Sequence, residues 1–257
     1  MKYNKLLVAL IIGIFMISSM SIVLAANSSD TSNVSRTHGL FDATSTSTNW
    51  SGYAVTGPSN SVSFVGGYWT VPAIASACTS TNTYSSFWVG IDGYSSNSVE
   101  QLGTDSDCSS GSPSYYAWYE MYPHPSYLIN TITIKPGDTI YASVTFSGSR
   151  TFTLYMKDVT SGNTFSKNFR SKASRSSAEW IVEAPYSGGI LPLANFGTAY
   201  FTSDSATISG TNSYINGFSS ASTYQINMVT SSGALKDTTS SLGKNGDFSV
   251  TWVSQGP

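Results

Sequence analysis

The chain has 257 residues, of which 40% are hydrophobic, 13% aromatic and only 10% charged. Twelve Lys and Arg against 14 Asp and Glu give a formal net charge of −2, with no basic stripe or cluster, which excludes a nucleic-acid-binding protein. The chain has no H-E-x-x-H or C-x-x-C spacing, no phosphate-binding loop and no dinucleotide fingerprint, so neither a metal nor a cofactor is expected.

The first 25 residues predict a secretory signal peptide. Two lysines precede an apolar run over residues 6–17, and Val23 and Ala25 occupy the −3 and −1 positions of a cleavage site. The alternative is an uncleaved membrane anchor over residues 6–26, which the serines in its second half weaken. We expect cleavage, and hence an extracellular protein without stable membrane association.

The remainder divides into a short leader and one domain. Residues 26–48 are rich in Ser and Thr and predict a leader or a short pro-segment. From residue 49 to residue 257, runs rich in Val, Ile, Tyr, Phe, Trp and Thr alternate with turn clusters, which is typical of an all-β sandwich or barrel. No amphipathic helix is predicted. The expected strands cover residues 50–55, 63–71, 84–91, 98–103, 115–122, 130–134, 139–147, 151–158, 164–169, 178–183, 198–202, 205–208, 224–229 and 248–253.

The cysteines and the low charge agree with an extracellular setting. Cys78 and Cys108 are the only cysteines, and outside the cell we expect them to form one disulfide. A pair of free thiols is the alternative. A protein with few charged residues has few ion pairs to lose when acid protonates its carboxylates, so the composition fits an acidic habitat.

Strand alternation groups carboxylates with aromatic side chains. Residues two apart in a strand share a face, so carboxylates and aromatics fall together on single strand faces. Burying such a face between two sheets is costly, and the pattern instead predicts a concave sheet that lines a ligand groove. The shared faces carry Tyr116, Trp118, Glu120 and Tyr122; Glu179, Ile181 and Glu183; and Val99, Gln101 and Gly103.

Counting residues narrows the chemistry to carboxylates and amides. His38 lies in the leader and His124 between two prolines, and no G-x-S-x-G motif is present, so a Ser/His or Cys/His mechanism is not favoured. All four glutamates fall in predicted strands, where Glu is uncommon. A carboxyl group beside aromatic walls can gain the raised pKa of a general acid or base. The alternative is that these glutamates face solvent.

Six segments occur in an order that resembles one family. They read N-W-S-G-Y at 49–53, W-T-V-P at 69–72, F-W-V-G-I-D-G at 87–93, Q-L-G at 101–103, A-W-Y-E-M-Y-P at 117–123 and A-E-W-I-V-E at 178–183. Together they resemble the glutamic peptidases, also called eqolisins, over residues 49 to 202. The resemblance implies two seven-stranded antiparallel sheets packed as a curved sandwich like that of concanavalin-type lectins. It also implies endopeptidase action on polypeptides at acid pH, without metal or cofactor.

The resemblance further implies a catalytic dyad of Gln101 and Glu183, with Glu120, Trp88 and Asp92 lining or supporting the site. These residue types suit peptide hydrolysis. Glu183 is expected to accept a proton from the attacking water and return it to the leaving amine. Gln101 is expected to donate an N–H group to the developing oxyanion and to orient the water with its carbonyl. Nothing in the sequence requires more than a monomer.

Other functions remain open. Lectin-like sandwiches also bind sugars on aromatic faces, so a carbohydrate-binding module is an alternative, and fold alone does not separate the two. A glycoside hydrolase using Glu120 and Glu183 is another, which needs carboxyl groups about 5 Å or about 6.5–9.5 Å apart. An inactive surface protein with the same fold is a further alternative. The pairing of Gln101 with Glu183 favours the peptidase, since a lectin has no use for it.

Overall fold

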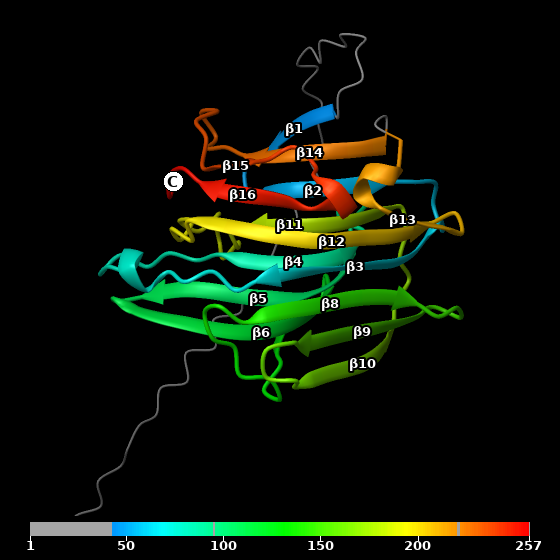
Figure 1. Ribbon diagram of the computed structural model, residues 1–257, viewed down its shortest axis with the longest axis horizontal. Coiled ribbons are helices and arrows are strands. Elements are labelled where there is room, and N and C mark those ends of the chain that lie inside the picture. Colours follow the sequence, from blue (N-terminus) through cyan, green and yellow to red (C-terminus); the bar gives the residue numbers. More distant parts are fainter. Residues whose placement is uncertain (1–42, 95, 220–221, 257) are drawn as a thin grey trace, which may run out of the picture.

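The computed structural model of the protein describes residues 43–94, 96–219 and 222–256. Within these residues two large β-sheets pack face to face (Figure 1), so the predicted all-β sandwich is confirmed. The predicted signal peptide and most of the predicted leader lie outside the described residues. The described part of the chain contains no helix with the length and apolar character needed to cross a membrane.

The first sheet has eight strands, and its neighbours are antiparallel except for one parallel pair at the edge, β1 with β14. In spatial order the strands are β1 (Ala43–Ser47), β14 (Thr223–Met228), β2 (Trp50–Thr56), β11 (Ser177–Glu183), β4 (Ser86–Ile91), β5 (Val99–Ser109), β6 (Ser112–Tyr122) and β7 (Tyr127–Leu128).

The second sheet also has eight strands. Its order is β10 (Thr164–Arg170), β9 (Thr151–Asp158), β8 (Thr139–Phe146), β3 (Val62–Thr70), β12 (Thr198–Ile208), β16 (Phe248–Trp252) and β15 (Asp237–Thr239), with β13 (Thr211–Tyr214) paired to β12. The helical elements among the described residues are short 3₁₀ turns, namely η1 (Ala75–Ala77), η2 (Ile215–Gly217) and η4 (Lys244–Gly246).

The strands differ from the expected pattern in several places. Each sheet has eight strands instead of seven: four short strands, β1, β7, β13 and β15, were not expected, while one expected strand is absent and two others are joined. No strand forms over residues 130–134, a segment that the structure describes in full. Its alternating Ile132 and Ile134 are buried in the core from a loop. The two strands expected over residues 198–208 are one strand, β12, interrupted by a shift of register between Thr202 and Ser205.

The main core fills the space between the sheets. Large side chains such as Trp69, Phe87 and Trp180 are fully buried there. The indole groups also bind within the core: Trp69 Nε1 donates to Thr104 Oγ1 at 2.9 Å, and Trp180 Nε1 donates to the Gly66 carbonyl at 3.0 Å. Their burial therefore leaves no indole donor without a partner, which removes the main cost of placing Trp in a core.

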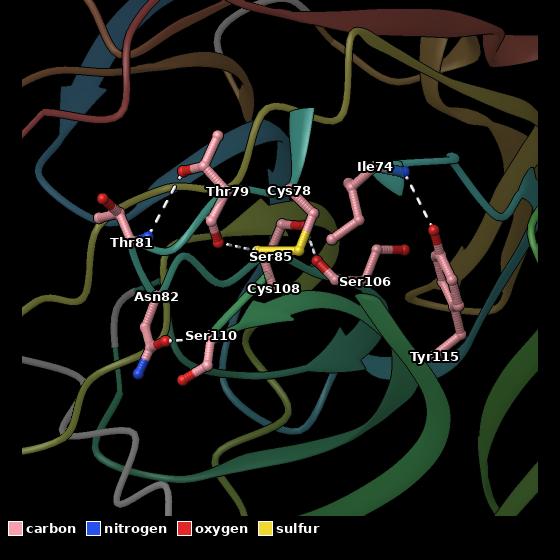
Figure 2. Close-up of a disulfide and its surroundings, with 10 residues drawn as sticks. All are labelled: Ile74, Cys78, Thr79, Thr81, Asn82, Ser85, Ser106, Cys108, Ser110 and Tyr115. Atoms are coloured by element: carbon pink, nitrogen blue, oxygen red, sulfur yellow. Dashed lines mark hydrogen bonds between the residues drawn. A yellow bond between two sulfur atoms is a disulfide. The ribbon is translucent and has the colours of Figure 1, made fainter. Parts of the chain in front are cut away.

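The expected disulfide joins Cys78 to Cys108, with the two Cα atoms 5.3 Å apart (Figure 2). It ties the loop after η1 to the end of β5. The residue just before η1 is held on β6, where the Tyr115 hydroxyl accepts a hydrogen bond from the Ile74 amide at 3.1 Å. The bridge and this bond fix the connection between the two sheets against the hairpin of β5 and β6.

Candidate active site

Four neighbouring strands of the first sheet, β11, β4, β5 and β6, carry the candidate residues on the face turned away from the second sheet. Across the register, Glu183 lies opposite Ser86, which in turn lies opposite Asp105. Gln101 lies opposite Gly90 on one side and Glu120 on the other. The grouping of carboxylates and aromatics that strand alternation predicted is therefore the arrangement found.

This outer face has an apolar cluster of its own, separate from the main core. We call it the outer cluster; its buried members are Trp50, Ala54, Trp88, Val99, Trp118, Ile181 and Ile226. The aromatic side chains cover the middle strands so closely that every residue of β4 and β11 is buried. An antiparallel sheet commonly has one solvated face. Here the carboxyl groups of the outer face lie in a largely dry environment.

Glu183 is the last residue of β11 and is only 3% exposed. Trp88 Nε1 donates to Glu183 Oε2 at 2.8 Å, and Asn49 Nδ2 donates to Glu183 Oε1 at 3.4 Å. Burial is the largest influence on this carboxyl and raises its pKa to about 8. The hydrogen bonds from the two donors act in the opposite direction, because they favour the charged form.

Two glycines allow the Trp88 ring to lie against the sheet. A Cβ atom at Gly103 would lie 2.6 Å from the Trp88 Cβ and 2.4 Å from the Phe87 carbonyl oxygen, and one at Gly90 would lie 3.0 Å from Trp88 Cζ3. No larger residue fits at Gly103 without displacing the strand. Trp50 then packs edge-on against Trp88, with ring centroids 4.9 Å apart. Together the glycines and the two rings hold the Trp88 Nε1–H group in position to donate to Glu183.

Gln101 is bound to Glu120 on the neighbouring strand. Gln101 Nε2 lies 2.5 Å from Glu120 Oε2, and the other amide atom, Oε1, is buried without a partner among the described residues. The pKa of Glu120 is raised to about 8, first by burial and then by the charge of Glu183, while the Gln101 hydrogen bond lowers it. Gln101 thus contacts Glu120 directly, and Glu183 influences the same carboxyl through its charge.

A second carboxyl pair lies beside this group, and the sequence analysis did not single it out. Trp118 Nε1 donates to Asp105 Oδ1 at 2.5 Å. The Tyr116 hydroxyl lies 2.8 Å from Asp105 Oδ2 and 2.7 Å from Asp107 Oδ2. One hydroxyl carries one proton, so one of these two contacts needs a proton on a carboxyl group. The alternation of Gln101, Asp105 and Asp107 along β5 was the signal that would have found this pair.

The pKa values of the pair agree with a shared proton. Burial raises the pKa of Asp105 to about 6, although Ser86, Tyr116 and Trp118 all donate to it. Burial and the charge of Asp105 raise the pKa of Asp107 well above its usual range. The Asp105 charge also helps to raise the pKa of Glu183. The outer face is therefore built to hold protons through the acid range.

Asp92 is placed differently from the other predicted site residues. It follows β4 with a positive φ of 72° and lies at the opposite end of β11 from Glu183. Its carboxylate accepts hydrogen bonds from the Arg175 amide at 2.6 Å and from the Ser176 amide at 2.8 Å. Asp92 therefore anchors the segment that leads into β11, a supporting role at a distance from the Glu183 carboxyl.

The glutamates are all buried, whereas His124 is exposed. Glu100 and Glu179 are fully buried, as are Glu120 and Glu183 to within 3%, so the alternative that the strand glutamates face solvent is wrong. His124 is exposed in the turn after β6. In the described residues no group of three or more His, Cys, Asp and Glu side chains is placed to hold a metal ion.

A lectin-like β-sandwich with buried carboxyl and amide side chains on the outer face of one sheet is the arrangement that the resemblance to the glutamic peptidases implied. The model of the peptidase A4 family matches residues 48–252. The chain therefore belongs to the peptidase A4 family, and the resemblance is confirmed.

The relatives agree in sequence and in structure. Aspergillopepsin-2 of Aspergillus niger is 32% identical over 187 residues, which are 64% of this chain and 66% of that protein. Scytalidopepsin B of Scytalidium lignicola is 35% identical over 115 residues, 43% of each chain. The chain thus spans less than two thirds of either relative. The crystal structure of scytalido-glutamic peptidase with a transition state analog inhibitor matches 80% of this chain and 98% of its own, with a TM-score of 0.68 and 27% identity.

Proposed function

We propose that this protein is an exported endopeptidase that hydrolyses peptide bonds in acid, with Gln101 and Glu183 as its catalytic dyad. The observation that carries the proposal is the Glu183 carboxyl, buried yet bound by the Trp88 indole, on the same sheet face as Gln101. Family membership supports the activity, because both sequence relatives and the solved structural relative are named as peptidases.

In this mechanism Glu183 handles the proton. Its ionised form takes a proton from the water that attacks the scissile carbonyl, and its protonated form returns that proton to the leaving amine. Burial raises the pKa of Glu183 and so makes its carboxylate a stronger base than an exposed one, but in acid the carboxyl group is then mainly protonated. The Trp88 and Asn49 donors oppose this effect, because they favour the ionised form. One carboxyl group thus serves both half-reactions without a covalent intermediate.

Gln101 and Glu120 have positioning and stabilising roles. The Gln101 amide stays uncharged at every pH, so it remains a hydrogen-bond donor to the oxyanion in acid. Its N–H group is directed to Glu120 Oε2. We infer that Glu120 holds the Gln101 side chain in place until the oxyanion forms.

The test is hydrolysis of denatured casein or haemoglobin by the purified protein from about pH 2 to pH 7, a range that brackets ordinary carboxyl pKa values. Glu183→Gln should lower turnover by about 10²- to 10⁴-fold, because it removes the general base. Pepstatin should have no effect on the wild type. Circular dichroism of the variant separates loss of chemistry from loss of fold.

Two results would contradict the proposal. A correctly folded wild-type protein that cleaves neither substrate at any pH cannot be an endopeptidase of this kind. A covalent acyl-enzyme trapped during turnover would exclude direct attack by water.

The sugar-binding and glycosidase alternatives gain no support from the relatives, which are named as peptidases. Export, removal of residues 1–25 and a monomeric state belong to the same proposal, as does the leader expected over residues 26–48, although its residues 43–47 form β1 of the first sheet. The disulfide between Cys78 and Cys108 supports export, since such bonds persist in oxidising compartments. The N-terminal sequence of the secreted protein tests the cleavage after Ala25.

A further inference from the structure

Acidic and basic side chains of this protein differ in how deeply they are buried. Among the described residues no Asp or Glu is exposed: Asp247 is half-buried and all the others are buried. The exposed charged side chains are all basic, namely Lys135, Arg150, Lys167, Arg170, Lys172 and Lys244. The formal charge of −2 therefore describes the composition, whereas the described surface is cationic.

Part of this cationic surface forms a pocket of about 180 Å³. It lies where the turn between β8 and β9, at the right of Figure 1, meets the loop before β3 and the segment that joins β10 to β11. Its charged lining is entirely basic, and its floor includes two phenylalanines. The lining residues that matter here are Asn60, Phe146, Arg150, Phe152, Lys172 and Arg175.

Arg175 is fixed before any ligand arrives. Its Nη1 donates to the Val62 carbonyl at 3.0 Å and its Nη2 to Asn60 Oδ1 at 3.3 Å. The guanidinium carbon also lies 3.8 Å from the centre of the Phe146 ring. A guanidinium has five N–H groups, so these bonds leave donors free to bind a ligand. The fork is therefore preorganised, and binding does not have to immobilise it.

The backbone holds the other two cations near it. The Arg150 carbonyl accepts a hydrogen bond from the Ser171 amide at 3.0 Å, which ties the β8–β9 turn to the segment that carries Lys172 and Arg175. Arg150 itself has a positive φ of 63°, a conformation that a turn rather than a strand imposes. Residues from two distant parts of the sequence thus place three like charges around one small pocket.

No carboxylate lines this pocket. The two carboxyl groups behind it are already engaged: Asp92 accepts the Arg175 and Ser176 amides, and Glu100 accepts the Ser171 hydroxyl at 2.9 Å. Of the three cations, Arg175 is partly compensated by the charge of Asp92. Like charges around one pocket repel one another, and an anion between them removes that repulsion. Among the described residues the lining thus brings three basic side chains together with no carboxylate.

We propose that this pocket is a binding site for a tetrahedral oxyanion, a phosphate or sulfate group, with Arg175 as the fixed fork and Arg150 and Lys172 closing over it. An Arg fork matches the oxygen spacing of such groups and can bind two oxygens at once. A carboxylate ligand loses its charge below a pH of about 4, whereas a phosphate group keeps at least one negative charge. The anion comes either as the free ion or as an ester on a peptide substrate.

The site is tested by isothermal titration calorimetry of the whole secreted chain at about pH 4.5, with inorganic phosphate in one arm and O-phosphoserine in the other, at constant ionic strength. The test variant is Arg150→Gln/Lys172→Gln. The matched control is Lys135→Gln/Lys244→Gln, which removes the same charge from exposed positions elsewhere. Arg175 is left intact because its side chain also supports the loop.

The wild type and the control should bind with equal affinity, and the Kd of the test variant should rise by about tenfold or more for the loss of two charged donors. Tighter binding of O-phosphoserine than of phosphate would assign the site to esters, and the reverse would assign it to the free ion. Equal weakening in both double variants, or no binding by the folded wild type, would overturn the proposal. All exchanged side chains are exposed, so the variants should keep their fold.

Discussion

The two faces of the first sheet differ although the same strands build both. On β5, Leu102 points to the second sheet and belongs to the main core, whereas its neighbour Gln101 points outward to Glu120. The inner face is covered by a second sheet. The outer face is covered by its own tryptophans, two of which, Trp88 and Trp118, donate to carboxylates through their indole nitrogens. One strand thus supplies packing and chemistry in alternate residues.

The two faces therefore bury their side chains in different ways. Between the sheets, exclusion of water follows from the packing of two apolar surfaces. On the outer face it follows from a few large rings laid over glycines, so the carboxyl groups are buried yet lie next to the solvent that substrate must come from. The inner face should therefore govern stability and the outer face activity.

A substitution at Gln101 should lower activity without lowering stability. Gln101→Ala should lower kcat by about 10²- to 10³-fold, a loss of about 2.7–4 kcal/mol of transition-state stabilisation, if Gln101 donates to the oxyanion. Its free energy of unfolding should change little. Loss of the Gln101 N–H group favours the protonated form of Glu120, so no buried charge is left without a partner. Steady-state kinetics and urea denaturation of the same preparation measure both quantities.

The neighbouring residue gives the contrast. Leu102→Ala should cost about 2–5 kcal/mol of stability, because it opens a cavity in the main core, while the folded fraction keeps its kcat. If Leu102→Ala lowered kcat as much as Gln101→Ala did, the two faces would not be functionally separate.

Asp204 is a carboxyl group inside the core, in contrast to Glu183 on the outer face. It lies within the register shift of β12 and is fully buried, and neither of its oxygens has a partner among the described residues. A Cβ atom at Gly67 would lie 2.0 Å from its Oδ1, so only glycine leaves room for it. Burial raises the pKa of Asp204 well above its usual range.

Asp204 should therefore make the protein less stable as the pH rises. An Asp whose folded pKa is raised costs nothing below its unfolded pKa of about 3.9 and lowers stability by about 1.4 kcal/mol for each pH unit above it, until the folded pKa is reached. Asp204→Asn should remove this slope, so the free energy of unfolding of the variant should rise relative to that of the wild type as the pH increases above about 4 in urea denaturation. Parallel stability curves for the two proteins would contradict the expectation.

Removal of the Trp88 indole donor should shift the pH dependence of activity by a modest amount. Trp88→Phe removes the hydrogen bond to Glu183 Oε2, which favours the charged carboxylate, so the pKa of Glu183 should rise by about one unit. The acid limb of the kcat/KM profile should move to higher pH by the same amount. Trp252→Phe, which loses a longer indole bond to the Leu193 carbonyl at 3.4 Å, serves as the matched control and should leave the limb in place.

The sequence predicted the all-β class, the disulfide and the shared faces, because these depend on local periodicity and on the presence of two cysteines. Gln101 and Glu183 came from a family resemblance, and their roles stay a prediction. The sequence did not predict that β5 continues to Ser109. The polar run after Gly103 is typical of a turn, and only the Trp118 and Tyr116 groups across the register make a strand of it.

Two further features could not be predicted, because they also depend on contacts between distant parts of the chain. Strand β1 was expected to be part of the leader, because a Ser- and Thr-rich segment has no apolar face, yet it finds a parallel partner in β14. The burial of nearly every carboxyl group was also beyond prediction. The number of charged residues does not tell how deeply each is buried. That burial depends on which side chains from distant parts of the chain pack against the strand.

The inward placement of the acids has a practical consequence for handling the protein. A purification planned from the formal charge of −2 would choose an anion exchanger near neutral pH. Because the described surface presents Lys and Arg while several acids keep their protons, the protein should instead be retained by a cation-exchange resin, and more strongly as the buffer is made more acidic. Its retention on an ion exchanger would therefore depend on which charged side chains are exposed and not on the total number of acidic and basic residues.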